Sequence, residues 1–132
     1  MKKLYLLLWL LISFASARAQ DEIDKTAELI KSANVQQLSK LFATTVELSI
    51  LETEDSYPAA KAAEMLSDFF NQHEPKSVKV LHRVTSNANY RFAVILLTTG
   101  NGNYRVSFNL KNKAGHFELN DLHIETQKQN SP

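Results

Sequence analysis

The chain of 132 residues contains no cysteine, only three glycines and only three prolines. Without cysteine there is no disulfide, no thiolate metal ligand and no nucleophilic thiol, so a domain of this size must rely on its hydrophobic core. The three glycines leave no room for a glycine-rich phosphate loop, and the G-x-S-x-G and calcium-loop patterns are absent. The sequence therefore shows no motif of a known reaction.

The N-terminus has the pattern of a secretory signal peptide. Lys2 and Lys3 precede an apolar run from Leu4 to Phe14, and small residues follow at Ala17 and Ala19. The run is shorter than the roughly 20 residues of a membrane span, and the small residues are typical of a cleavage site. We expect cleavage after residue 19 and export to the periplasm or the medium.

Cleavage at this point changes the charge of the protein. Three basic residues leave with segment 1–19, so the net charge falls from +1 to −2. Nucleic acids and anionic membranes are bound by clustered Lys and Arg, so we expect neither partner. The remaining length predicts one α+β domain over 20–126, followed by a disordered polar tail over 127–132.

Apolar residues at helical spacing predict three helices, and alternating ones predict strands. The helices cover 22–33, 35–42 and 59–71, with Pro58 in the first turn of the third helix. The segment from Glu52 to Ser56 reads as a polar turn. The predicted strands are 46–50, 78–84, 92–96, 104–110 and 116–125.

The phase of the alternation predicts which side chains face inward. If Thr98 pairs with Tyr104, the even-numbered residues of the middle strands share one interior and the odd-numbered ones face out. The last strand changes phase along its length, which predicts a β-bulge at Asn120–Asp121. The resulting fold is α+β in the order α-α-β-α-β-β-β-β, with helices packed in a strongly curved antiparallel sheet.

Three stretches resemble one known family. They are "VQQLSKLFATTVELSI" at 35–50, "AAKAAEMLSDFFNQHEPKSVKVLH" at 59–82 and "FELNDLHIE" at 117–125. They look like the domain of unknown function 4783 family, within the nuclear transport factor two-like (cystatin-like cone) superfamily. The resemblance implies a cone-shaped fold and an exported protein. It implies no reaction, because the superfamily includes isomerases, dehydratases and binding modules.

The inward series predicts a pocket for a small hydrophobic ligand in the cone. His82 is its one polar side chain, which favours either a general base or a plain hydrogen-bonded histidine near a strand end. Since no carboxylate is placed to orient it, a proton-transfer enzyme ranks last, and no cofactor or metal is expected. The predicted lining is Phe69, Val80, His82, Val94, Val106 and Phe108.

The outward series predicts a contact surface. Arg83, Arg91 and Arg105 are expected on this face with an apolar row, which a half-exposed sheet would not normally carry. The alternative is that a loop, the first helix or the tail covers the row. We therefore predict a non-catalytic binding or self-association domain, with a homodimer formed through Leu81, Ile95, Leu97 and Arg105. The pocket is the alternative function.

Overall fold

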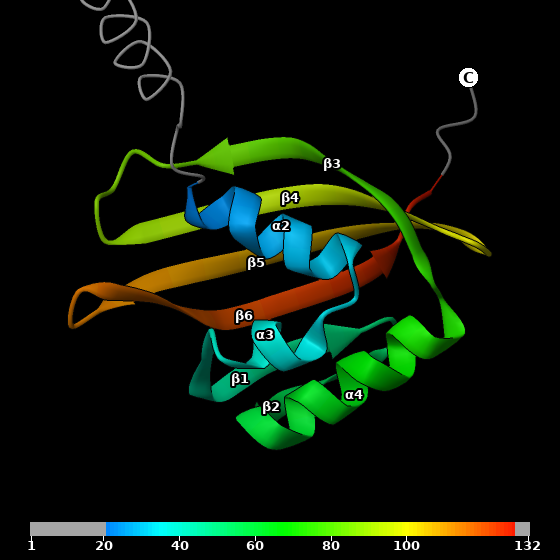
Figure 1. The fold of residues 1–132 in the computed structure, drawn as a ribbon, viewed down its shortest axis with the longest axis horizontal. Coiled ribbons are helices and arrows are strands. Elements are labelled where there is room, and N and C mark those ends of the chain that lie inside the picture. The colour runs from blue at the N-terminus through cyan, green and yellow to red at the C-terminus, as the bar shows by residue number, and fades with distance from the viewer. Residues whose placement is uncertain (1–20, 129–132) are drawn as a thin grey trace, which may run out of the picture.

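The computed structural model describes residues 21–128, which form an α+β domain (Figure 1). The helices of this part of the chain lie against one face of a six-stranded sheet that curves around them without closing into a barrel. The predicted fold class is confirmed. The predicted signal peptide at 1–19 and the last residues of the predicted tail, 129–132, lie outside the described residues.

The first two helices form near their predicted positions. α2 (Glu22–Lys31) begins at Asp21, whose carboxylate accepts a hydrogen bond of 2.8 Å from the N–H of Asp24. This cap satisfies one of the free N–H groups of the first turn. α3 (Val35–Ser39) follows after a short turn and is capped by Asn34 in the same way.

The third helix supplies much of the core. α4 (Ala59–Gln72) starts directly after Pro58, which occupies the N-cap position without a side-chain hydrogen bond and lies just before the first turn. Its apolar face is broad enough to be buried against the sheet along several turns. The buried side chains of α4 are Ala62, Leu66, Phe69 and Phe70.

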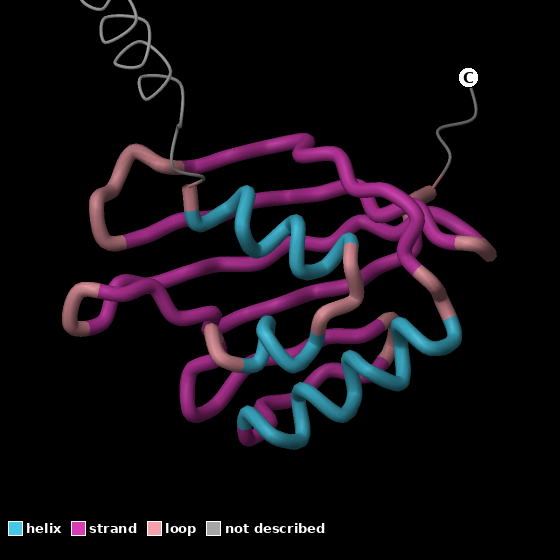
Figure 2. Tube along the Cα trace, viewed as in Figure 1, coloured by secondary structure: helices cyan, strands magenta, loops and turns pink. Residues whose placement is uncertain are grey.

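The strands lie across the sheet in the order β2-β1-β6-β5-β4-β3. All neighbours run antiparallel except β1 and β6, which are parallel. The helices cover only one face, so the sheet has an inner face toward the helices and an outer face (Figure 2). The bounds are β1 (Phe42–Ile50), β2 (Thr53–Pro58), β3 (Pro75–Val84), β4 (Tyr90–Thr99), β5 (Gly102–Lys113) and β6 (His116–Thr126).

The polar turn predicted at Glu52–Ser56 is wrong, because most of this segment is β2. It pairs with β1 across a turn at Leu51 and Glu52. β2 is an edge strand, and nearly all of its side chains are exposed. A strand that buries neither face carries no apolar alternation, so its sequence resembles a loop.

The predicted bulge in β6 is confirmed. Asp121 pairs with Asn109 and Leu119 pairs with Leu110, which leaves Asn120 without a partner. The extra residue brings the two halves of the strand into one phase. The side chains of β6 on both sides of it are buried, namely Leu119, Leu122 and Ile124.

The predicted phase of β4 is wrong by one residue. The turn between β4 and β5 has only two residues, so Tyr104 pairs with Leu97 and not with Thr98. Because a shift of one residue exchanges the faces of a strand, Ile95 and Leu97 point inward and are fully buried. Val94 points to the outer face.

β3 contains a bulge that the sequence did not predict. Val80 pairs with Ile95 and His82 with Val94, so Leu81 is left unpaired. Beyond the bulge the phase is reversed, and His82 is exposed on the outer face. Arg83 consequently points to the helix side.

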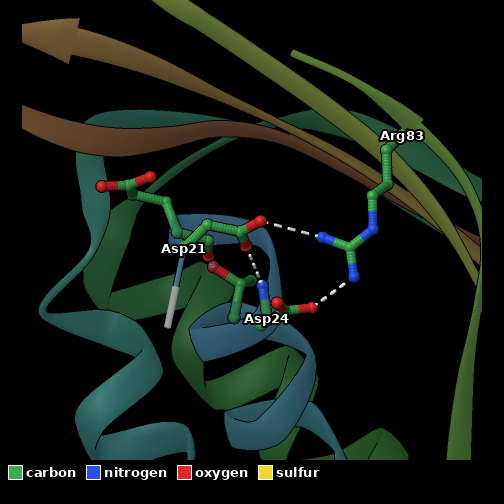
Figure 3. A network of polar contacts seen from close by, with 5 residues as sticks. Asp21, Asp24 and Arg83 are labelled. Atoms are coloured by element: carbon green, nitrogen blue, oxygen red, sulfur yellow. Dashed lines mark hydrogen bonds and ion pairs between the residues drawn. The ribbon is translucent and has the colours of Figure 1, made fainter. Parts of the chain in front are cut away.

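The reversed phase lets Arg83 bind the start of α2 (Figure 3). Its guanidinium donates to Oδ2 of Asp21 at 3.0 Å and also contacts the carboxylate of Asp24. The pKa of Arg83 is raised, chiefly by the hydrogen bond to Asp24. The contact ties the edge strand to the first helix.

Candidate functional site

The six residues of the predicted pocket do not come together. Phe69, Val106 and Phe108 are buried in the core, and Val80 packs against it. Phe69 and Phe70 meet edge to face at 5.8 Å between ring centroids, so side chains fill the interior there. The other two residues, His82 and Val94, lie on the outer face.

Two of the four residues predicted for the contact surface are exposed. Leu81 is 43% exposed, and Arg105 is exposed on the outer face. Ile95 and Leu97 belong to the core instead, because of the one-residue shift in β4.

The predicted cluster of three arginines does not form. Arg83 turns toward α2, as described above. Arg91 stacks over the ring of Phe117 at 5.0 Å from its centroid and donates to the carbonyl of Tyr90. Only Arg105 remains on the outer face, where Nε lies 3.9 Å from Oε1 of Glu125.

β4 nevertheless has apolar side chains on both of its faces. The odd-numbered ones point toward the helices and belong to the core. A strand with one face in water normally has polar side chains there. No helix of the described part of the chain covers the outer face (Figure 2). The outward apolar side chains of β4, which we call the β4 strip, are Phe92, Val94 and Leu96.

The outer face carries opposite charges on its two halves. Residues that pair directly on neighbouring strands share a face, so the register assigns the outer positions. On β3, β4 and β5 these positions hold Lys, Arg and one His but no carboxylate: Lys79, His82, Arg105, Lys111 and Lys113. On β6, β1 and β2 they hold carboxylates and two His but neither Lys nor Arg: Glu47, Glu54, His116, Glu118, Asp121, His123 and Glu125.

A hollow of about 440 Å³ lies on the outer face beside the β4 strip, and Asn109, Asp121 and His123 contribute to its lining. Nε2 of His123 is 2.5 Å from Oδ1 of Asp121 and forms an ion pair with it when the ring is protonated. The Oδ1 atoms of Asn109 and Asp121 are buried without a well-aligned hydrogen-bond donor. Buried acceptors without donors cost free energy, so this hollow favours a partner that brings N–H groups.

A second hollow, which we call the α4 cleft, lies where α4 ends. It is open to solvent, has a volume of about 700 Å³ and is lined by the C-terminal half of α4, the β1–β2 turn and the end of β6. Its apolar lining is Ile50, Leu51, Met65 and Phe69. Its ionisable lining is Glu52, Asp68, His73 and Glu125.

The sequence prediction missed the α4 cleft. Neither Asp68 nor His73 was among the predicted site residues. One signal was present, because Leu51 is a large apolar residue at the start of a polar segment. In the structure Leu51 is 44% exposed and lines the cleft.

Within residues 21–128, no group of three or more His, Asp or Glu side chains is placed to hold a metal ion. None of the helices in this range is long and apolar enough to cross a membrane.

Comparison with known proteins identifies the family. The family described as Domain of unknown function (DUF4783) matches residues 23–125. The chain belongs to this family. The resemblance expected from the sequence is confirmed, and no curated protein matches the chain.

Solved structures of DUF4783 proteins have the same fold. The protein from Bacteroides uniformis ATCC 8492 has a TM-score of 0.77 at 22% identity, over 83% of this chain and 100% of its own. The one from Bacteroides ovatus ATCC 8483 has a TM-score of 0.73 at 23% identity, over 79% and 94%. A domain of unknown function with a cystatin-like fold from Nostoc punctiforme PCC 73102 has a TM-score of 0.63 at 8% identity, over 80% of this chain and 72% of its own. At these identities the likeness shows the cystatin-like cone alone.

Proposed function

We propose that this DUF4783 domain is an exported, non-catalytic domain that associates with a second copy of itself through the outer face of its sheet. The β4 strip is the observation that carries the proposal. A strand that is apolar on both faces is typical of one buried on both faces. Val94 is only 5% exposed in a single copy, so a second sheet would bury chiefly the apolar surface of Phe92 and Leu96. That burial gains about 25 cal/mol per Å² of apolar surface.

The charges on the outer face favour one arrangement of the two copies. A face-to-face pair has a two-fold axis between its sheets. If the axis runs across the strands, β6 lies over β6 and carboxylates face carboxylates. The axis can instead run along the strands and lie between β4 and β5. In that case β3 of one copy lies over β6 of the other.

The second arrangement places a basic strand of one copy over an acidic strand of the other. In the register Lys79 is level with Glu125, so Lys79 of one copy then faces Glu125 of the other. His82 is level with His123, the outer position next to Asp121, whose Oδ1 has no well-aligned donor within one copy. Complementary charges set the orientation of an interface and reject others. The two β4 strips lie next to each other at the centre, where burial contributes most to binding.

Gel filtration with light scattering on residues 20–132, at tens of micromolar, tests the proposal. We expect the wild type to be a dimer and Leu96→Glu to be a monomer, since a carboxylate in the strip is desolvated without a partner. The dissociation constant should rise by about 100-fold or more. Leu51→Glu is the matched control, because it makes the same change at an exposed leucine away from the outer face. Circular dichroism confirms that both variants fold.

The orientation is tested by exchange of charges. Lys79→Glu should weaken the dimer, and Glu125→Lys in the same chain should restore it, because the two positions face each other across the interface. A monomeric wild type at about 100 μM, or a dimer that Leu96→Glu leaves unchanged, contradicts the proposal. A dimer that the charge exchange does not restore contradicts the along-strand axis.

A further inference from the structure

His73, at the end of α4, has a ring that the domain holds in one orientation. The ring centroid lies 4.6 Å from that of Phe69 and 5.0 Å from that of Tyr104. Nδ1 lies 2.8 Å from Oδ1 of Asn101 and 3.0 Å from the hydroxyl of Tyr104. Both polar contacts of the ring are made by Nδ1. Whether Asn101 turns its oxygen or its nitrogen toward Nδ1 therefore decides whether Nδ1 or Nε2 of the neutral ring carries the hydrogen.

Asn101 is itself oriented by the end of the helix. Its Nδ2 donates to the carbonyl of Gln72, the last residue of α4, at 3.1 Å. The opposite orientation would place its oxygen against that carbonyl, so Oδ1 is directed at His73. Nδ1 of His73 therefore donates to Asn101. In the neutral ring Nε2 is then an acceptor, and it has no hydrogen bond within residues 21–128.

The charged groups of the α4 cleft are acceptors as well. Carboxylates come from all three walls, namely Glu52 of the turn, Asp68 of α4 and Glu125 of β6. Arg105 approaches only Glu125, at 3.9 Å, and no Lys or Arg lines the cleft. Walls with charges of one sign concentrate their field in a cleft, so the α4 cleft attracts cations.

The apolar part of the cleft includes a strained residue. Leu51 has φ of 56°, a left-handed conformation that costs free energy for a residue other than Gly or Asn. Its N–H donates to the carbonyl of Ile124 at 2.8 Å, which anchors the turn to β6. The turn thus presents a large apolar side chain at the edge of a hollow.

We propose that the α4 cleft binds a small organic cation, an amine attached to an apolar body. The apolar body packs against Leu51, Met65 and Phe69, and the ammonium group lies near the carboxylates of Glu52 and Asp68. An N–H or O–H of the ligand donates to Nε2 of His73. The volume of about 700 Å³ is in the range of small-molecule sites. This site shares only Glu125 with the outer face, and its apolar lining does not depend on self-association.

The experiment uses three probes that share one apolar body and differ in charge. They are phenethylamine, N-acetylphenethylamine and 3-phenylpropionate, titrated into ¹⁵N-labelled residues 20–132 and followed by amide chemical shifts. We expect phenethylamine to shift the amides of Leu51 and of 68–73. The neutral and anionic probes should bind at least about tenfold more weakly, because only the amine meets the carboxylates.

Matched substitutions then assign the charge effect. Asp68→Asn should raise the dissociation constant for phenethylamine about threefold or more. Glu64→Gln is the control, since it removes a carboxylate from the solvent side of the same helix, where Glu64 faces Lys61. Long-range ¹H–¹⁵N spectra should show His73 with its hydrogen on Nδ1. Equal binding of all three probes, amide shifts outside the cleft, or no binding up to about 10 mM amine overturns the proposal.

Discussion

β6 has one unpaired residue, and β3 has one at Lys76 near its start and one in its middle. The bulge in β6 and the bulge in the middle of β3 have different surroundings. In β6 the extra residue is Asn120, and β6 lies inside the sheet between β1 and β5. Buried apolar side chains continue on both sides of it. In β3 the extra residue is Leu81, and β3 is an edge strand. Only the half before Leu81 turns apolar side chains toward the core.

The difference shows what a bulge can do in each place. In an inner strand it reconciles two apolar halves with one core, so the core determines its position. At an edge the second half is free of the core, and the reversed phase directs Arg83 to Asp21 and Asp24. The inner bulge serves packing, whereas the edge bulge serves a polar contact.

Single-residue deletions in β6 should have the largest effect. Deletion of His123, a paired residue, reverses one half of the strand and turns Ile124 out of the core. Loss of this burial costs about 3–5 kcal/mol, a large part of the stability of a domain of this size. We expect the melting temperature to fall by more than about 10 °C or the cooperative transition to vanish, as followed by circular dichroism.

Deletion of Asn120 is the matched control. It removes the unpaired residue, so Leu119 and Asp121 keep their partners and their faces. This variant should keep a cooperative transition. If both deletions lower the melting temperature equally, the bulge does not set the phase of β6.

A pair of substitutions in β3 should show the next largest effect. Without a bulge Val80 and Val84 would share a face, but the structure places them on opposite faces. Val80→Asp puts a charge against the core and should cost about 2–3 kcal/mol of unfolding free energy. Val84→Asp on the outer face should cost less than about 1 kcal/mol in urea unfolding at low protein concentration. Equal losses would show that β3 has no reversed phase.

The sequence could predict the bulge in β6 because both of its halves carry a pattern. Leu119 and Leu122 cannot face the same core in a regular strand, so the alternation itself required an extra residue. In β3 the half beyond Leu81 holds His82 and Arg83, and polar side chains at an edge are compatible with either phase. The helices could be predicted for the same reason as the bulge in β6, namely that a buried face leaves a pattern of apolar residues. Their apolar faces are buried along their whole length.

Site residues were placed on the wrong face where both the odd-numbered and the even-numbered positions of a strand are apolar. In β4 the residues from Phe92 to Leu97 are all apolar, so alternation could not choose a face, and the length of the next turn decided it. The assumed pairing of Thr98 with Tyr104 moved Ile95 and Leu97 to the wrong side. The α4 cleft was missed because three segments distant in sequence form it.

Arg83→Met should have the smallest effect. The variant keeps most of the side chain and removes the ion pairs with Asp21 and Asp24. All three side chains are more than a third exposed, so solvent screens the pairs, and the loss should be at most about 1 kcal/mol. The buried side chains of α2, such as Ile23 and Ile30, keep the helix in place.

Salt distinguishes this electrostatic loss from lost packing. In about 1 M NaCl the screening length is roughly 3 Å, so the difference between Arg83→Met and the wild type should nearly disappear. Arginine is charged near neutral pH in the unfolded state, and the pKa of Arg83 is raised further in the folded state, so its titration adds no pH dependence there. Hydrogen exchange should be faster in the first turn of α2, where Asp24 and Lys25 lie. A loss of about 3 kcal/mol that salt does not reduce would assign Arg83 to the core and remove the contrast between the edge bulge and the inner one.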